Sequence, residues 1–256
     1  MKTLIRIVLI AVASLVLLAA INFAPLISLK TPGMREYAAH GISVWATPEH
    51  AAEVEPLAER VASQSAAVVE ALEGADAQGV EIIVYPSRGA LKRKTIGLIG
   101  MVLLPDWFVG RNTRDYVLIA SPADSGPSHS RESIVQASVH EYVHVMTDRR
   151  YRELGYWMKE GIALYLAGQV PEDARVQQHS DLTYAEFSTP SAMQFAEVGG
   201  YFLAYSMIEY MIEHYGWDAV VDLIDPAASH ESVLGVSERE LYEAWIEDVR
   251  SGSVGA

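Results

Sequence analysis

Two histidines and a glutamate stand close together in Val139-His140-Glu141-Tyr142-Val143-His144. On a helix, side chains at positions i and i+4 lie one above the other on the same face. His140 and His144 can therefore point at one metal ion, with Glu141 beside them. The H-E-x-x-H spacing is that of a zinc metallopeptidase site, in which the glutamate holds a water against the ion. The stretch thus predicts a helix that carries two metal ligands.

A second informative stretch follows, Trp157-Met158-Lys159-Glu160-Gly161-Ile162-Ala163-Leu164-Tyr165. Its pattern predicts a helix over residues 157–167. Glu160 lies among apolar neighbours, where an unpaired carboxylate costs free energy. Gly161 and Ala163 are small, so we expect this helix to pack closely on the helix that carries the histidines. Such packing would bring Glu160 to the same ion as a third ligand.

Each candidate ligand also has a plainer interpretation. The two histidines could be surface residues or capped core residues. Glu160 could instead form an ion pair with Arg149 or Arg150. Against these alternatives, a carboxylate on a second helix agrees with the ligand set of a metal site.

Three protein ligands suit a catalytic zinc ion, which keeps a fourth position for water and lowers the pKa of that water to about 7. Glu141 would accept the proton of the water and later pass it to the leaving amine. An oxyanion that develops during the reaction needs a further hydrogen-bond donor. Tyr201 and Tyr205, in a predicted helix over residues 201–215, are the candidates, with core packing as the alternative for either.

The residues before the histidines predict a small sheet. Apolar patterns indicate strands over residues 41–45, 81–85 and 116–120. A helix capped by Thr47 follows the first strand, and Ser128 or Ser130 caps the helix that carries the histidines.

Residues 96–110 are unusually apolar and predict a buried strand with its turn. The alternatives are a flap over the site or a surface that rests on lipid near the amino-terminal segment. The carboxyl-terminal part contains an irregular segment and a final helix. Residues 169–199 are polar and irregular, and Ser237-Glu238-Arg239-Glu240 is a capping box that opens a last helix.

The composition excludes several classes of protein. The chain has 256 residues, 50% of them hydrophobic, so it can form a core. A net charge of −14 argues against nucleic acid as a partner, because phosphate binding needs clustered lysine and arginine. The absence of cysteine excludes thiolate ligands, disulfides and cysteine nucleophiles. The sequence gives no indication of an oligomeric state.

Residues 1–29 indicate where in the cell the protein is located. Lys2 and Arg6 precede an apolar run long enough to span a bilayer, which takes about 20 residues. No clean small-x-small cleavage site follows, so we expect an uncleaved membrane anchor rather than a cleaved signal sequence. The early positive charges predict a cytoplasmic amino terminus and an extracytoplasmic domain over residues 30–256. The alternative is a secreted or periplasmic protein after cleavage.

The two stretches together resemble the gluzincin metallopeptidases, and most closely their compact "peptidase MA-like" domains. The shared pattern is H-E-x-x-H followed by W-x-x-E-G-x-A-x-Y. The resemblance implies zinc ligands at His140, His144 and Glu160, with Glu141 as the general base. It also implies an α+β, zincin-like fold, in which a small mixed sheet with helices precedes a mostly helical part.

The same resemblance carries two finer expectations. An edge strand that pairs with the substrate backbone would match residues 116–120. The oxyanion tyrosine would fall on Tyr201 more readily than on Tyr205. We therefore expect a membrane-anchored zinc metallopeptidase that hydrolyses peptides or proteins. The alternative is a non-catalytic module that keeps the fold, and perhaps the metal, but binds a partner. An intact Glu141 favours the enzyme, because a binding module does not need a general base.

Overall fold

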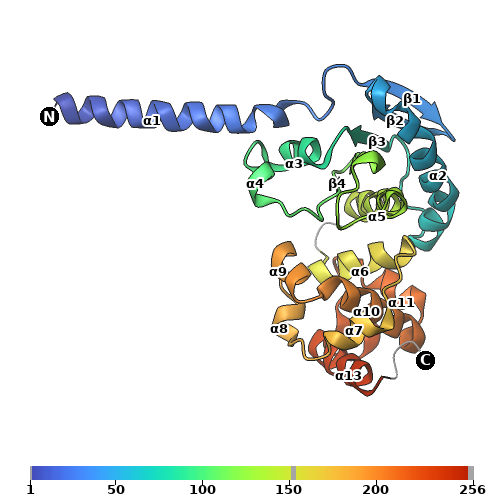
Figure 1. The fold of residues 1–256 in the computed structure, drawn as a ribbon. Coiled ribbons are helices and arrows are strands. Elements are labelled where there is room, and N and C mark those ends of the chain that lie inside the picture. The colour runs from blue at the N-terminus through green and yellow to red at the C-terminus, as the bar shows by residue number, and fades with distance from the viewer. Residues whose placement is uncertain (1, 151–153, 253–256) are drawn as a thin grey trace. The chain divides into compact units, whose positions relative to one another are not determined.

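The computed structural model describes residues 2–150 and 154–252. The residue contacts group into two compact units, one of residues 1–62 and 79–138, the other of residues 63–78 and 139–256. Figure 1 gives the order of the elements along the chain. The contacts do not separate residues 1–29 from the first unit, and the predicted boundary at residue 30 stays a prediction.

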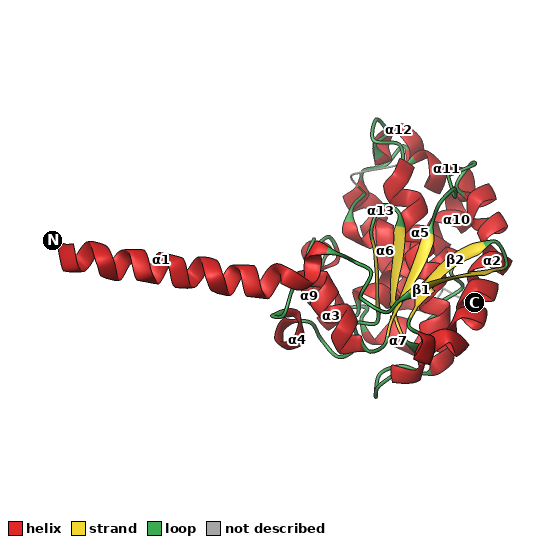
Figure 2. Ribbon diagram, turned by 90° about the horizontal axis from the view of Figure 1, so that it is seen from above, coloured by secondary structure: helices red, strands yellow, loops and turns green. Residues whose placement is uncertain are grey.

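The first unit contains a five-stranded mixed sheet with the strand order β1-β2-β3-β5-β4 (Figure 2). The inner pairs β2–β3 and β3–β5 are parallel, and the outer pairs β1–β2 and β4–β5 are antiparallel. The strands are β1 (Arg35–Ala39), β2 (Ile42–Ala46), β3 (Glu81–Tyr85), β4 (Gly110–Asn112) and β5 (Tyr116–Ala120). The three predicted strands are confirmed, within one residue for β2. The two outer strands were not predicted.

β5 is not an edge strand, so the expectation drawn from the family resemblance is wrong on this point. Residues 110–112 return antiparallel to β5, with Arg111 opposite Leu118. The turn between the two strands is closed by hydrogen bonds between Thr113 and Tyr116, in which each backbone amide is a donor. A strand of three residues has too little pattern to be recognised in a sequence. The edge on this side of the sheet is therefore β4.

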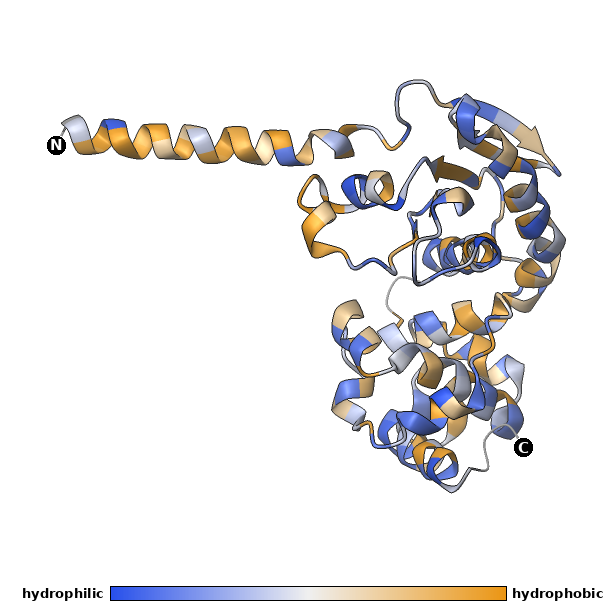
Figure 3. Cartoon of the chain, viewed as in Figure 1, coloured by the Kyte–Doolittle hydropathy of each residue, from blue (hydrophilic) through white to orange (hydrophobic). Residues whose placement is uncertain are grey.

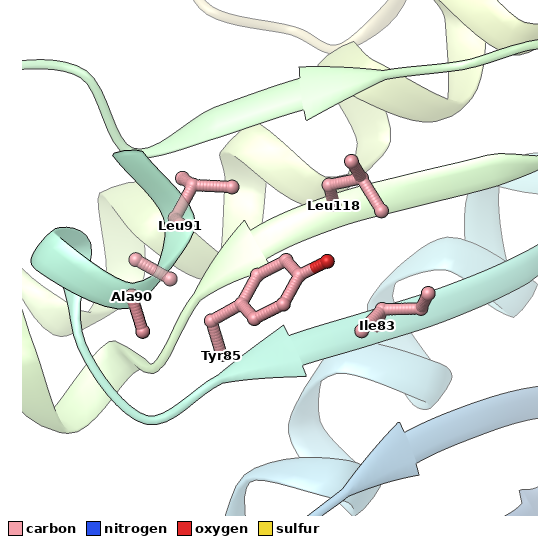
Figure 4. Packing of buried hydrophobic residues seen from close by; sticks show 6 residues of the cluster. Ile83, Tyr85, Ala90, Leu91 and Leu118 are labelled. Atoms are coloured by element: carbon pink, nitrogen blue, oxygen red, sulfur yellow. The ribbon is translucent and has the colours of Figure 1, made fainter. Parts of the chain in front are cut away.

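The core of this unit lies where the sheet meets helix α3 (Arg88–Ile96). Figure 4 shows the side chains of Ile83 and Tyr85 from β3 and Leu118 from β5 beside Ala90 and Leu91 of α3. The unbroken apolar pattern of β3 suits a strand with a parallel neighbour on each side. β5 has the same pattern but is parallel to β3 and antiparallel to β4.

The remaining helices are mostly in the second unit. Among the described residues the α-helices, besides α3, are α1 (Lys2–Phe23), α2 (Val54–Ala71), α4 (Gly100–Leu103), α5 (Arg131–Arg150), α6 (Tyr156–Leu166), α7 (Asp173–Gln178), α8 (Tyr184–Phe187), α9 (Ala192–Glu197), α10 (Gly200–Tyr215), α11 (Trp217–Asp222), α12 (His230–Leu234) and α13 (Glu238–Ser251). Short 3-10 helices are η1 (Ala24–Ile27), η2 (Pro48–Glu53) and η3 (Pro122–Asp124). The structure is thus α+β with one small mixed sheet, as predicted at this coarse level.

Local signals placed α5, α6, α10 and α13 correctly. The helix predicted after Thr47 instead begins as the 3-10 helix η2, in which Thr47 makes no side-chain capping hydrogen bond, and α2 starts at Val54. Ser130 caps α5, because its hydroxyl accepts a hydrogen bond from the Ser133 amide at 3.0 Å. The predicted capping box opens α13, with Ser237 and Glu240 bonded reciprocally. The predictions for α6 and α10 are correct to within one residue at each end.

Two sequence predictions of segments are wrong. Residues 96–110 do not form a buried strand: they contain the end of α3, the short helix α4 and an exposed apolar turn. The positive φ of 88° at Gly97 ends α3 and turns the chain before a strand can begin. Residues 169–199 are not irregular throughout, since they contain α7, α8 and α9. Helices of four to six residues are too short to show a period in the sequence.

Helix α1 is 22 residues long, and its large apolar side chains are exposed to solvent. At 1.5 Å per residue it measures about 33 Å, enough to cross the hydrocarbon core of a bilayer. Among the described residues, Thr3–Ile27 is the one candidate span. This apolar amino-terminal helix indicates a membrane anchor or a signal sequence.

Candidate metal centre

His140 and His144 lie one turn apart on α5, in the second unit. Their rings meet edge to face, with centroids 4.6 Å apart. The two Nε2 atoms are 3.0 Å from each other. The predicted i, i+4 geometry is therefore present, and both rings turn the same nitrogen to one point.

Glu160 of α6 brings a carboxylate to this point. Its Oε2 atom lies 3.2 Å from His140 Nε2 and 3.5 Å from His144 Nε2. His144 and Glu160 are buried, and the side chain of His140 is 12% exposed. These three residues could hold a metal ion, and within residues 2–150 and 154–252 they are the one group found with that arrangement.

The helix around the histidines is more buried than we expected. The residues from Glu141 to Thr147 are buried without exception, so α5 has no exposed stripe at this level. Side chains that bind a catalytic ion commonly face a cleft, whereas His144 is only 4% exposed. Burial strengthens each electrostatic interaction at the site, because water does not screen it.

The charges of the three groups depend on one another. Burial alone would raise the pKa of Glu160, but the attraction of His144 and the hydrogen bonds from both imidazoles outweigh it, so the pKa is lowered. Burial lowers the pKa of His144 and holds its imidazole neutral. Burial also lowers the pKa of His140, but the hydrogen bond to Glu160 and the negative charge of Glu160 outweigh it, so the pKa of His140 is raised. An ionised carboxylate and a neutral imidazole are forms that bind metal.

Arg149 and Arg150 are not the partners of Glu160 in this structure. Arg149 donates hydrogen bonds to the backbone carbonyls of Asp76 and Gln78, at 2.7 and 2.8 Å. Arg150 pairs with Glu73 at 3.0 Å. The ion-pair interpretation of Glu160 therefore loses both of its proposed partners.

The Nδ1 atoms of the two histidine rings lack hydrogen-bond partners among the described residues. Nδ1 of His140 and Nδ1 of His144 are buried, and no described group forms a hydrogen bond with either. Gln169 lies beside His140 and raises its pKa, although no bond of normal geometry reaches its buried Oε1 atom. When Nε2 binds a metal, Nδ1 carries the proton and needs an acceptor.

Glu141 is buried on α5, with 9% of its surface exposed. Its negative charge contributes to raising the pKa of His140 and that of Tyr201. The carboxylate of Glu141 therefore interacts electrostatically with His140 and with Tyr201 in the first turn of α10.

A pair of tyrosines completes the surroundings of Glu160. The hydroxyls of Tyr156 and Tyr201 are 2.9 Å apart. Burial raises the pKa of both phenols most, and the negative charge of Glu160 raises it further. Both phenols therefore stay protonated and can donate a hydrogen bond. Tyr201 was predicted from the sequence and Tyr156 was not, although its position four residues before Glu160 on the same helix was a usable signal.

Tyr205, the other predicted tyrosine, has different neighbours. Its ring lies 5.8 Å from that of Tyr165, centroid to centroid. Burial is the main cause of its raised pKa, and the charge of Glu209 comes next. In the part of the chain that the structure describes, no hydrogen bond, ion pair or ring contact joins Tyr205 to the three candidate ligands, so the structure brings Tyr201, and not Tyr205, to the site.

Small residues on α6 serve a different contact from the one we expected. A Cβ atom at Gly161 would lie 2.6 Å from the backbone oxygen of Ala204 on α10. Gly161 therefore lets α6 approach α10, and the two helices lie side by side in Figure 1. Besides the contacts of Glu160 with the two histidines, α6 is linked to α5 by an ion pair between Lys159 and Asp148 at 2.7 Å.

Comparison with protein-family models, with curated proteins and with solved structures gave no match.

Proposed function

We propose that this chain is a membrane-anchored, zinc-dependent metallopeptidase. The observation that carries the proposal is the triangle formed by His140 Nε2, His144 Nε2 and Glu160 Oε2, with sides of 3.0, 3.2 and 3.5 Å. Ligands bound tetrahedrally to zinc at about 2.0–2.1 Å are about 3.3 Å from one another. The three atoms already have nearly that spacing, and two imidazoles with one carboxylate are a ligand set of catalytic zinc.

Glu141 fits the role of general base. A zinc ion in this site would polarise a substrate carbonyl and make hydroxide available near neutral pH. Glu141 would take the proton of the attacking water and return it to the leaving amine. Its position next to the first ligand on α5, and its electrostatic effect on Tyr201, support this assignment.

Tyr201 fits the role of donor to the oxyanion that develops on the carbonyl. Its hydroxyl is held by Tyr156 at 2.9 Å, so it is oriented before substrate binds. Tyr156 would act as a positioning residue. Peptides or proteins are the proposed substrates because the chemistry of the site is that of amide hydrolysis, and the residues resemble the gluzincin pattern.

The test uses the full chain in detergent micelles. Metal content is measured by mass spectrometry, and cleavage by the release of fluorescence from a quenched, unstructured protein. We expect bound zinc and cleavage in the wild type. In Glu141→Gln we expect zinc to remain and the rate to fall by about 10²- to 10⁴-fold.

Two outcomes would reject the proposal in different ways. Zinc retained with no cleavage in either protein would favour the non-catalytic binding module. A wild type that takes up no zinc, and whose properties do not change in Glu160→Gln, would remove the metal site itself. Glu209→Gln, on α10 beside Tyr205, is the matched control because it changes a partly buried carboxylate outside the triangle.

A further inference from the structure

Apolar side chains are exposed in one short segment of the first unit. Beyond Ile27, six of the nine exposed large hydrophobic residues that the structure describes fall between residues 98 and 107. We call them the α4 patch; its members are Leu98, Ile99, Met101, Val102, Leu103 and Trp107. Val102 is 80% exposed. Scattered exposed apolar residues need no explanation, but a cluster of this kind marks a contact surface.

The α4 patch is attached to the end of α1 by hydrogen bonds. The amide of Leu98 donates to the carbonyl oxygen of Asn22 at 3.0 Å, and the amide of Ile99 donates to Asn22 Oδ1 at 2.9 Å. α1 ends at Phe23, so the Asn22 carbonyl belongs to the last turn and has no partner within the helix. The patch therefore caps the apolar helix.

A glycine makes this close approach possible. A Cβ atom at Gly97 would lie 2.3 Å from the Asn22 oxygen, which is too close for any other residue. The positive φ of 88° also suits glycine. Lys94 adds a second attachment, because its Nζ atom donates to the carbonyls of Pro25 and Ser28, at 2.8 and 2.5 Å. The exit of α1 and the α4 patch are thus joined at several points within one unit.

Basic groups border the patch, and the acidic residue within its range, Asp106, forms an ion pair with Lys92 at 3.1 Å. Residues 96–105 contain no charged side chain. Arg93 reaches the sulfur of Met101, and Arg111 donates to the carbonyl of Thr95 at 2.9 Å. In a chain with a net charge of −14, this local pattern of exposed apolar residues beside cations is unusual. It is the pattern of surfaces that lie in the headgroup region of a bilayer.

We propose that the α4 patch is a second, shallow membrane contact, which inserts into the headgroup region of the bilayer that α1 enters. Figure 3 shows the apolar turn of α4 beside the carboxyl-terminal end of the apolar helix α1. Because Asn22 lies in the last turn of α1 and binds the patch directly, the patch lies at the carboxyl-terminal end of the apolar helix. The tryptophan of the patch suits that position, where indole rings are enriched. The proposal requires that α1 is retained, and it does not depend on the proposed peptidase activity.

The test uses the absence of cysteine from the chain. A single Val102→Cys substitution gives a unique site for an environment-sensitive fluorophore. The matched control is Val170→Cys, at a residue that is 68% exposed after α6. The labelled full-length chains are reconstituted into vesicles of phosphatidylcholine and phosphatidylglycerol, and the mass of the chain confirms that α1 is present. Quenching is measured with spin-labelled lipids and with aqueous iodide.

We expect the label at position 102 to be quenched several-fold more by lipid labelled near the headgroup than the label at position 170, and to be less accessible to iodide. Equal accessibility to iodide at both positions would overturn the proposal. Protection from iodide without quenching by lipid would also overturn it, since a protein, such as a second copy of the chain, would then cover the patch.

A backbone variant tests the attachment to α1. Gly97→Ala should reduce lipid quenching at position 102, because the methyl group displaces the patch from Asn22. Gly33→Ala is the matched control: its φ is 90°, but nothing lies within 4 Å of its Cβ position. An equal effect of the two substitutions would mean that the link to Asn22 does not place the patch.

Discussion

At the scale of single residues, the hydroxyl pair of Tyr156 and Tyr201 distinguishes a catalytic site from a site that only binds a metal. Both phenols are partly buried beside the carboxylate of Glu160, and both hold their protons because burial and that charge raise their pKa values. A site that only binds a metal does not need an oriented donor that makes no contact with the ion. The pair therefore gives the catalytic proposal a test that is independent of Glu141.

Tyr201→Phe should lower the rate of peptide cleavage by about 10²-fold or more, since removal of one donor to an oxyanion has an effect of that size. Metal affinity should change little, because the phenol is not a ligand. Tyr156→Phe should have a smaller effect on the rate, as it loosens the orientation of Tyr201 without removing the donor. Steady-state kinetics with a fluorogenic peptide, together with zinc titration against a chromophoric chelator, measure both quantities.

Tyr205→Phe is the control for this prediction. Its hydroxyl interacts with Glu209 on its own helix, so cleavage should stay near the wild-type rate. A loss of activity in Tyr205→Phe equal to that in Tyr201→Phe would show that the helix as a whole, and not one hydroxyl, is what the reaction requires.

At the scale of elements, α6 is positioned by two contacts of different kinds. Its Gly161 faces the backbone of α10, and Lys159, next to the ligand Glu160, pairs with Asp148, one turn after His144 on α5. The ion pair is about one-third exposed, so its contribution to stability is small. The packing of α6 on α10 should therefore be the stronger restraint on the position of Glu160.

Gly161→Ala should destabilise the protein by about 1–3 kcal/mol, because the added methyl group meets backbone and cannot be relieved by a rotamer change. The new Cβ atom would lie 2.6 Å from Ala204 O and 2.7 Å from Ile208 Cγ1. Denaturant unfolding of the full chain in micelles, followed by near-ultraviolet circular dichroism, measures the change.

Gly155→Ala, at the start of the same helix, provides the comparison. Its added methyl group would be 3.7 Å from the nearest atom, which is ordinary contact. We expect a loss of less than about 1 kcal/mol there, from the weaker cap that alanine makes. Similar losses at the two positions would mean that the α6–α10 contact is not as tight as the structure has it.

At the scale of the whole molecule, metal binding at the candidate centre should increase the stability of the folded chain. A ligand that binds only the folded chain stabilises it, by about 4 kcal/mol at a concentration 1,000 times its dissociation constant. Removal of metal with a chelator should therefore increase hydrogen exchange in peptides that cover residues 139–150 and 156–166. The effect should be smaller in the first unit, where the structure describes no comparable group of ligands.

The same coupling has a defined pH dependence. Zinc excludes protons from the imidazoles of the folded state, whereas unfolded histidines take up protons below about pH 6.5. Stabilisation by the metal is complete above that pH and is lost as the pH falls below it. The variant Glu160→Gln is the control, as it should respond weakly to the chelator at every pH. An unchanged exchange pattern in the wild type on chelation would contradict a bound metal.

Much of this site was readable from the sequence because its signals are local. The spacing of His140 and His144 fixes their geometry on one helix, whatever surrounds it. Glu160, a carboxylate in an apolar helix, needed a partner, and the nearest chemistry that explains it is the histidine pair. Caps at Ser130 and Ser237 act within one turn and were recognisable for the same reason.

Contacts between distant segments could be decided only by the tertiary structure. Neither the pairing of Tyr156 with Tyr201 nor the contact of Gly161 with α10 follows from spacing along the chain. The apolar run from Leu98 to Leu103 was predicted to be a buried strand. A sequence pattern shows that a segment is apolar, but it does not show whether protein or another environment covers that segment. Its attachment to Asn22 at the end of α1 depends on how the chain returns there, and that is a property of the fold.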